Sequence, residues 1–313
     1  MNEFEFIKGL NFSDHKDYKQ GYPNGCDLKD DIALLAPHPE GVLIVSKDII
    51  AEDTHFFADD PLDKIIQKAI RVNISDIAAK GAKPYGFMVG LLLPEWIRSA
   101  ENLKIIQDTL NNESQYFNMP LIGGDTVHAK NFAISVTIFG ICSGPPPLRS
   151  GARIGDNIYV TGTLGESASG LYIKQHHIAS NNADKFRQKY LLPEPPFRLG
   201  QALYSYMSAA CDISDGLIND LEHILKASQC GAYIDIDTIP HANAFANDDL
   251  NLRLALTGGD DYQILFTSSA HEKEINMLSQ SHTIPITKIG HITQGNKITY
   301  SREIDIQATL KNF

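Results

Sequence analysis

The stretch at 211–226, CDISDGLINDLEHILK, concentrates side chains that can bind a ligand. Asp212 and Asp215 bracket Ser214, Gly216 follows, and apolar residues then recur with helical spacing. The three oxygen-bearing side chains therefore lie at a helix start, where they can cap backbone N–H groups and where the helix dipole favours negative charge. One such residue is enough for a cap, whereas clustered carboxylates suit hard divalent cations. Taken alone, this stretch fits a cap and a metal site equally well.

Polar groups recur at the predicted ends of strands. Asp30 and Asp31 precede an apolar run, and Lys47 and Asp48 follow a short predicted strand at 42–46. Another apolar run ends in GGDT, where two glycines let the backbone approach a ligand closely and Asp125 can reach a metal on that ligand. A solvated turn explains each group taken singly. Strand ends that open into loops are also where open α/β sheets bind ligands.

A predicted helix that begins at Pro61 and ends near Gly81 carries a polar pair beside its buried face. Asn73 falls on the stripe of isoleucines, and Asp76, three residues on, is its neighbour on the helix surface. Such groups need partners, because an unpaired buried polar group costs free energy. A satisfied pair in the core and a bound cation or ligand are equally good explanations.

Two short motifs occur once in each half of the chain. Ile-Ser-Asp ends the tetrapeptides at 73–76 and 212–215, and Gly-Gly-Asp follows at 123–125 and 258–260. This order suggests two related α/β halves that present carboxylates to one cleft. Mutual repulsion makes such a cluster costly unless cations neutralise it, so we predict several Mg²⁺ ions with phosphates completing their shells. The carboxylates are Asp31, Asp48, Asp76, Asp125, Asp212 and Asp215.

Other chemistries find less support in the sequence. Glycoside hydrolysis uses paired carboxylates but needs only two of them. The hydrolase motifs GxSxG and HExxH do not occur in the chain. The glycines after the predicted strand at 157–161 match neither GxxxxGK[ST] nor GxGxxG, so close packing explains them better than a phosphate loop.

The chain is long enough for two domains of the α/β class. We predict a helix at 95–117 and a strand at 132–140, followed by the stiff GPPP linker at 144–147. The domains are therefore placed at 1–145 and 146–313. In the second, strands are predicted at 157–161, 232–236 and 262–267, with a surface loop at 176–198 and a small α/β tail. Arg149, just after the linker, suits a phosphate.

The composition narrows the class of protein. The 313 residues are 43% hydrophobic and 21% charged, and the net charge of −11 argues against a nucleic-acid partner. No run approaches the ~18 apolar residues of a membrane span, and the N-terminus does not read as a signal peptide. The four cysteines show no CxxC pairing, which favours reduced thiols in or near the core. We expect a cytoplasmic protein that binds neither nucleic acid nor membrane.

Taken together, a series of segments resembles the thiamine-monophosphate kinase family, in the superfamily of aminoimidazole ribonucleotide synthetase and selenophosphate synthetase. They are KDDIALL, SKDIIAEDTHFF, RVNISDIAAKGAKP, LIGGDT, RSGARIGD, VTGTLGESASGL, DISDGLINDLEHILKASQCGA, LTGGDDYQILFT and KIGHI. The resemblance implies a homodimer of two-domain α/β (α+β) subunits. In this family the N-terminal mixed sheets pair into a shared barrel, ATP lies between the domains, and the C-terminal domain is α/β.

The resemblance also implies a reaction, in which ATP and thiamine monophosphate give ADP and thiamine diphosphate by direct transfer without a phosphoenzyme. The acceptor phosphate is already a nucleophile at neutral pH, since its second pKa is near 6, so no general base is required. The obstacle is repulsion between two polyanions, which Mg²⁺ and Arg149 offset while holding the groups in line.

The resemblance assigns roles to individual residues. Metal positions are Asp31, Ser46, Asp48, Asp76, Asp125, Asp212 and Asp215. ATP contacts are Gly124, Asp125, Arg149 and Ser214. Acceptor contacts are His55, Asp260 and Leu310. The residues expected to carry catalysis are Asp48, Asp125, Asp212 and Arg149.

The chain departs from the family pattern at several positions. Lys47 stands where a Thr commonly binds metal, so its ammonium could replace a cation or touch a phosphate. Asp260 takes the place of a longer Glu, Leu310 that of an aromatic residue, and KDD that of GDD. Two alternatives therefore stay open: another ATP-dependent enzyme of the superfamily, and a nucleotide-binding regulatory homodimer without turnover.

Overall fold

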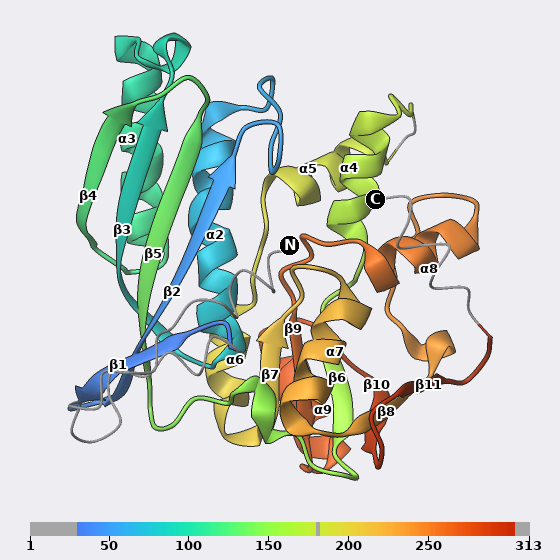
Figure 1. Ribbon diagram of the computed structural model, residues 1–313. Coiled ribbons are helices and arrows are strands. Elements are labelled where there is room, and N and C mark those ends of the chain that lie inside the picture. Colours follow the sequence, from blue (N-terminus) through green and yellow to red (C-terminus); the bar gives the residue numbers. More distant parts are fainter. Residues whose placement is uncertain (1–29, 180–181, 304–313) are drawn as a thin grey trace.

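The computed structural model describes residues 30–179 and 182–303, which form two mixed sheets with helices packed against them (Figure 1). The first sheet has the order β1-β2-β5-β3-β4, and the second has the order β11-β8-β10-β6-β9-β7. Neither sheet closes on itself within the described chain. The predicted two-domain α/β fold is confirmed at this level.

The first sheet gathers strands from the N-terminal part of the chain. Its neighbours are antiparallel except for the parallel pair β3–β4. Side chains in β2 and β5 alternate between buried and more exposed positions, as expected for a sheet covered on one face only. The strands are β1 (Ala33–His38), β2 (Gly41–Ala51), β3 (Lys83–Leu93), β4 (Leu121–His128) and β5 (Ala133–Cys142).

Helices α2 (Leu62–Ala79) and α3 (Ala100–Tyr116) cover the buried face of this sheet (Figure 1). Helix α2 begins after Pro61 and ends at Lys80, before Gly81 takes a positive φ of 63°. Its isoleucines pack with those of β2 and β5 in one core. The predicted helix at 95–117 is instead a short 3-10 turn, Glu95–Ile97, followed by α3.

The second sheet is antiparallel except for the pair β11–β8. Its strands are β6 (Asn157–Thr161), β7 (Ala209–Asp212), β8 (Gly231–Ile234), β9 (Ile264–Ser268), β10 (Ile286–Thr293) and β11 (Ile298–Tyr300). The helices of this part are α4 (Glu166–Gln175), α5 (Ala183–Leu191), α6 (Phe197–Leu203), α7 (Leu217–Ser228), α8 (Asp248–Thr257) and α9 (Glu272–His282). Short 3-10 turns lie at Arg149–Gly151, Tyr204–Tyr206 and Ile236–Thr238.

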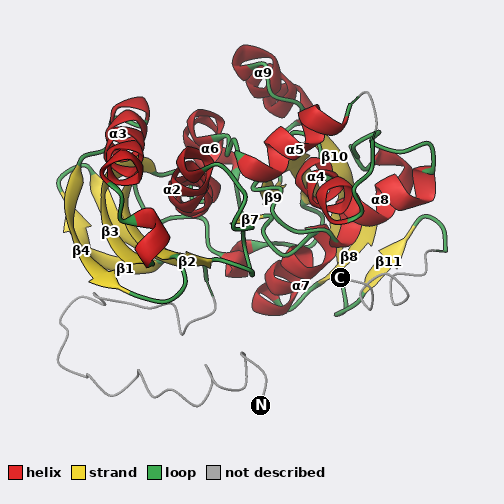
Figure 2. Ribbon diagram, turned by 90° about the horizontal axis from the view of Figure 1, so that it is seen from above, coloured by secondary structure: helices red, strands yellow, loops and turns green. Residues whose placement is uncertain are grey.

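Helices α2 and α6 lie between the two sheets, as Figure 2 shows. A buried cluster joins Ala78 of α2 to Leu199 of α6 and Phe266 of β9. The helices can approach closely because a Cβ on Gly200 of α6 would lie 2.2 Å from the carbonyl oxygen of Ala78. This packing holds α2, with Asp76 near its end, against the C-terminal sheet.

Several local predictions were wrong. Lys47 and Asp48 lie within β2, because the strand continues to Ala51 through its pairing with β5. The Gly-Gly-Asp triplet at 123–125 lies within β4 and is no turn. The predicted loop at 176–198 contains α5, whose buried Phe186 and Tyr190 pack beneath it.

Two further features concern composition. Cys142, Cys211 and Cys230 are free and buried, while Cys26 lies outside the described residues. Among the described helices none has the length and apolar character needed to cross a membrane.

Candidate active site

Three carboxylates from distant segments converge between the two sheets. Asp31 precedes β1, Asp76 lies in α2, and Asp212 ends β7. One oxygen from each can be chosen so that all lie within 4.8 Å of one another. Asp76 also accepts a hydrogen bond from the hydroxyl of Ser46 in β2. The tertiary structure therefore brings together four of the predicted metal residues, the three carboxylates and Ser46.

Burial and mutual repulsion oppose full ionisation of these groups. Burial, and then the charges of Asp31 and Asp48, raise the pKa of Asp212 to about 7. The pKa of Asp48 is raised to about 6, by burial and then by Asp31. For Asp76, burial and then Asp212 raise the pKa well above its ordinary value. A cluster of buried carboxylates that repel one another provides oxygen ligands and uncompensated negative charge, which fits a hard divalent cation.

Two cations, the buried Lys80 and the partly buried Arg149, compensate part of this charge. Lys80, which is fully buried, places its Nζ 2.8 Å from Asp30 Oδ1 and 2.8 Å from Asp31 Oδ2, and donates to the carbonyl of Ala210 at 2.7 Å. Arg149 forms an ion pair with Asp31. Burial opposes ionisation of Asp31, but Lys80 and Arg149 outweigh it and lower the pKa of that carboxyl. Sequence reasoning missed Lys80, although it follows Asp76 at the i, i+4 spacing of one helix face.

Asn73 proves to be a satisfied core residue. It is fully buried, accepts the backbone N–H of Asp48 at 3.0 Å, and donates to the carbonyl of Ala69 at 2.9 Å. Its amide thereby ties α2 to β2 next to the carboxylate cluster. Of the two explanations for the Asn73–Asp76 pair, a core partner holds for Asn73, while Asp76 belongs to the cluster.

Lys47 and Asp125 lie on the opposite face of the first sheet. Lys47 alternates with the inward-facing Ser46 and Asp48 and donates to the hydroxyl of Ser135. Ser135 pairs with Gly90, and Gly90 pairs with Asp125, so these side chains share one face. Within one chain, the side chain of Asp125 is therefore separated from the Asp31–Asp76–Asp212 cluster by the sheet, while Gly124 precedes it in β4.

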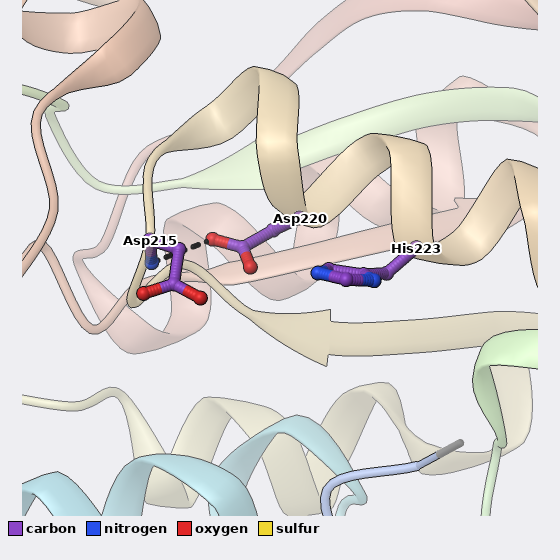
Figure 3. A group of neighbouring side chains, drawn as sticks. All are labelled: Asp215, Asp220 and His223. Carbon is purple, nitrogen blue, oxygen red and sulfur yellow. Dashed lines mark hydrogen bonds between the residues drawn. The ribbon is translucent and has the colours of Figure 1, made fainter. Parts of the chain in front are cut away.

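A turn at 213–216 presents Ser214 and Asp215 beside the cluster. Asp220 of α7 is buried, and its Oδ2 accepts the backbone N–H groups of Ser214 and Asp215, each at 3.0 Å. Figure 3 shows Asp220 between Asp215 and His223, and their ligand atoms lie within 4.8 Å of one another. Burial raises the pKa of Asp220 to about 8, helped by the charges of Asp212 and Asp215.

The cap explanation for this stretch thus holds in modified form. The side chain that satisfies the turn comes from Asp220, inside the helix, and not from Asp212, Ser214 or Asp215. Those three side chains remain available for ligands. Sequence reasoning missed Asp220 and His223, whose i, i+3 spacing places them on one face of α7.

A cavity of about 300 Å³ lies next to this turn and is lined by two of the three predicted acceptor residues, His55 and Asp260. Phe57 and Tyr190 add aromatic surface. A larger cavity of about 490 Å³ shares Asp260 and contains further aromatic residues, among them Phe197. Leu310, the third predicted acceptor contact, lies outside the described residues.

Backbone hydrogen bonds connect this cavity to the carboxylate cluster. The N–H of Asp260 donates to Ser214 at 2.9 Å, and that of Tyr262 donates to Ile213 at 2.8 Å. Gly259 is required for this approach, because a Cβ there would lie 2.4 Å from the carbonyl oxygen of Ser214. The segment at 258–262 and the turn at 213–216 are therefore joined by hydrogen bonds. The carboxylate cluster lies on one side of them, and the cavity of His55 and Asp260 lies on the other.

Comparisons with known proteins show which family the chain belongs to. The family model for AIR synthase related protein, N-terminal domain, matches residues 29–142, and the corresponding C-terminal domain matches 153–302. Thiamine-monophosphate kinase of Salmonella typhimurium (strain LT2) is 40% identical over 279 residues, which cover 85% of this chain and 83% of that relative. The chain belongs to the thiamine-monophosphate kinase family. The Escherichia coli (strain K12) enzyme is 39% identical over the same shares.

Solved structures of the thiamine-monophosphate kinase family have the same fold. The crystal structure of the enzyme from Stenotrophomonas maltophilia K279a has a TM-score of 0.79 at 34% identity and covers 88% of this chain and 90% of that one. AaThiL complexed with AMPPCP and TMP has a TM-score of 0.79 at 26% identity, covering 88% of this chain and 89% of that one. The predicted family is confirmed.

Proposed function

We propose that the chain is an enzyme that transfers the γ-phosphoryl group of ATP to thiamine monophosphate, giving ADP and thiamine diphosphate. The observation that carries the proposal is the juxtaposition of the carboxylate cluster with the cavity of His55 and Asp260. The names of the relatives and the AaThiL complex with AMPPCP and TMP support ATP and thiamine monophosphate as the two substrates.

The transfer proceeds directly between the two bound substrates. The acceptor phosphate carries the nucleophilic oxygen, and no side chain needs to remove its proton, because its second pKa is about 6. Arg149 forms an ion pair with Asp31 and so lies beside the cluster, where its guanidinium adds positive charge to that of the proposed Mg²⁺. The roles of Asp48 and Asp212 are to hold cations that bring the two phosphates in line.

We propose Mg²⁺ at the cluster, held by Asp31, Asp48, Asp76 and Asp212 with the hydroxyl of Ser46, and further Mg²⁺ at Asp215. The raised pKa values of Asp48 and Asp212 support this fit, because a bound cation offsets the repulsion that raises them. Bound there, Mg²⁺ supplies charge neutralisation for the triphosphate and the acceptor phosphate. Ser214, whose side chain the turn leaves available, is proposed to contact ATP.

A homodimer explains the outer face of the first sheet. Ile49, Met88 and Val127 share this face and are 54%, 41% and 47% exposed. Neighbouring exposed apolar residues on a sheet mark an interaction surface. We propose that the mate's sheet covers this face to complete a barrel, which brings Gly124, Asp125 and Lys47 to the subunit boundary. There Asp125 binds metal and nucleotide, and the ammonium of Lys47 replaces a cation.

Domain limits and location complete the proposal. The limits 1–145 and 146–313 agree with the gap between the two family matches, 29–142 and 153–302. We also propose a cytoplasmic location for the enzyme. A change of Met88→Asp tests the dimer: light scattering should show a monomer, whereas an unchanged mass contradicts the proposed interface.

The reaction is tested by incubating the purified protein with ATP, Mg²⁺ and thiamine monophosphate and measuring thiamine diphosphate by chromatography. Unphosphorylated thiamine serves as the matched acceptor control, and EDTA as the control for metal. Bound ATP without thiamine diphosphate would overturn the proposal in favour of a regulatory dimer. Transfer to a different acceptor would favour another enzyme of the superfamily.

A further inference from the structure

Lys68 of α2 lies behind the cavity of His55 and Asp260, with only 3% of the residue exposed. Its Nζ donates to Asp260 Oδ2 at 2.7 Å and to the backbone carbonyl of His55 at 3.1 Å. The same ammonium lies 4.2 Å from the centroid of the Tyr190 ring. One buried group therefore contacts both predicted acceptor residues and an aromatic residue of the cavity wall.

We infer that Lys68 is a positioning residue for the acceptor, which fixes His55 and Asp260 relative to each other. This inference rests on the proposed function, since it takes the cavity as the acceptor site. An ammonium has three N–H donors, and here two hydrogen bonds and one aromatic face use them. Lys68 consequently has no donor left for a substrate phosphate and acts through the residues that it holds.

The second oxygen of Asp260 is held as well. Tyr262 Oη donates to Asp260 Oδ1 at 2.9 Å, and the backbone of Asp260 has a positive φ of 66°. A positive φ is uncommon for a residue other than glycine and persists only where the surroundings impose it. The side chain is 31% exposed, so the carboxylate stays accessible from the cavity although both oxygens are anchored.

This arrangement defines the chemical class that the cavity recognises. Each carboxylate oxygen can accept more than one hydrogen bond, so Asp260 retains acceptor capacity toward the cavity. Lys68 offsets its charge, and Phe57 and Tyr190 present aromatic surface. The fitting ligand is a heteroaromatic ring with an N–H donor, recognised by hydrogen bonding and stacking more than by net charge. Lys68 selects for this class by holding the acceptor oxygen in one place.

The test compares Lys68→Met with Lys64→Met, a control one turn earlier in α2. Lys64 is more exposed, at 26%, and pairs with Asp63 and Gln67, away from the cavity. For Lys68→Met we expect KM for thiamine monophosphate to rise on the order of ten- to a hundredfold, because a hydrogen bond to a charged group is lost. KM for ATP should stay within about twofold of the parent value, and Lys64→Met should change neither constant.

A second variant keeps the test valid if Lys68→Met does not fold. Lys68→Gln keeps an N–H donor at this position but not the three donors and the charge of the ammonium, and we again expect a raised KM for thiamine monophosphate alone. An unchanged KM for thiamine monophosphate, or an equal rise in both constants, overturns the positioning role. If the parent protein forms no thiamine diphosphate, the proposed function fails separately. Calorimetric titration with thiamine monophosphate then decides the role of Lys68: equal or absent binding by parent and variant overturns it.

Discussion

The carboxylate cluster and the cavity of His55 and Asp260 differ in how far their charges are balanced. At the Asp31–Asp76–Asp212 cluster, buried carboxylates outnumber the cations Lys80 and Arg149, and burial with mutual repulsion raises the pKa of Asp212 to about 7. At the cavity of His55 and Asp260, Asp260 pairs with Lys68 at 2.7 Å. A surplus of buried negative charge indicates a place for cations, whereas a matched ion pair indicates a preformed surface for an organic ligand.

The largest expected effect comes from Asp212→Asn, which removes one carboxylate from the Asp31–Asp76–Asp212 cluster. We expect turnover to fall at least about a thousandfold, because an amide is a poorer Mg²⁺ ligand than a carboxylate. The metal-free variant should unfold at a temperature no lower than that of the parent, since repulsion decreases. Steady-state kinetics and thermal unfolding measure the two quantities.

The exposed Asp248→Asn serves as the control for this change, because its carboxylate is 79% exposed and pairs with His241, outside the carboxylate cluster. Near-normal turnover in Asp212→Asn would remove that residue from the metal site and erase the contrast between the two sides.

Because of the carboxylate cluster, the stabilisation of the folded protein by Mg²⁺ should depend on pH. The pKa of Asp212 is raised from 3.8 to about 7, so the folded protein binds more protons than the unfolded chain between these values. Ionisation of Asp212 therefore lowers the free energy of unfolding as the pH rises from about 3.8 to about 7. Asp31, with its lowered pKa, acts in the opposite direction only below its ordinary value of 3.8. Mg²⁺ binds the ionised form, so its stabilisation should be larger at pH 8 than at pH 5.

At a Mg²⁺ concentration about a hundred times Kd, the stabilisation is about 2.7 kcal/mol, a hundredfold shift in the folding equilibrium. Thermal unfolding at both pH values, with NaCl at matched ionic strength as the control, measures it. Equal stabilisation at pH 5 and pH 8 would contradict ionised carboxylates as the ligands.

Asp220 tests whether the turn between the two sides acts through hydrogen bonds or through charge. Asp220→Ala removes the acceptor of two backbone N–H groups, and we expect KM for ATP to rise about tenfold because Ser214 and Asp215 lose their fixed positions. Asp220→Asn retains an oxygen for both groups and should stay within about twofold of the parent. If Asn is as harmful as Ala, the charge of Asp220 matters, and a cation held with Asp215 and His223 becomes the better explanation.

The smallest effect is expected at the cavity of His55 and Asp260, where Lys68 balances the charge of Asp260. Tyr262→Phe removes the hydroxyl that donates to Asp260, which should raise KM for thiamine monophosphate about fivefold. The dependence of turnover on Mg²⁺ concentration should stay unchanged, because the hydroxyl belongs to the acceptor side. Tyr206→Phe, in a 3-10 turn away from the cavity, is the matched control. A shift in the Mg²⁺ dependence would show that the two sides are not separate.

Local patterns predicted much of the fold. Helix α2 begins after Pro61 and ends before Gly81 because the isoleucine stripe and these two residues act over a few positions. The two tetrapeptides that end in Ile-Ser-Asp do bring carboxylates to one place, since Asp76 and Asp212 belong to one cluster, although one Ile-Ser-Asp copy lies within α2 and the other in the turn before α7. Strand limits were missed where pairing decided them: β5 holds Lys47 and Asp48 inside β2. Ladder hydrogen bonds join residues far apart in the chain, and local patterns do not contain them.

The sequence by itself predicted which residues carry the chemistry: the aspartates before β1, in α2 and at the end of β7, with His55 and Asp260. Only the tertiary structure decided how they are grouped and what opposes their charge. It brought Asp31, Asp76 and Asp212 within reach of one another, placed Asp125 across the sheet, and supplied Lys80 and Lys68 as buried partners. The physical reason is that side-chain type and helical spacing are local properties. Burial, which raises the pKa of a carboxyl and makes a lysine necessary beside it, exists only once distant segments have packed together.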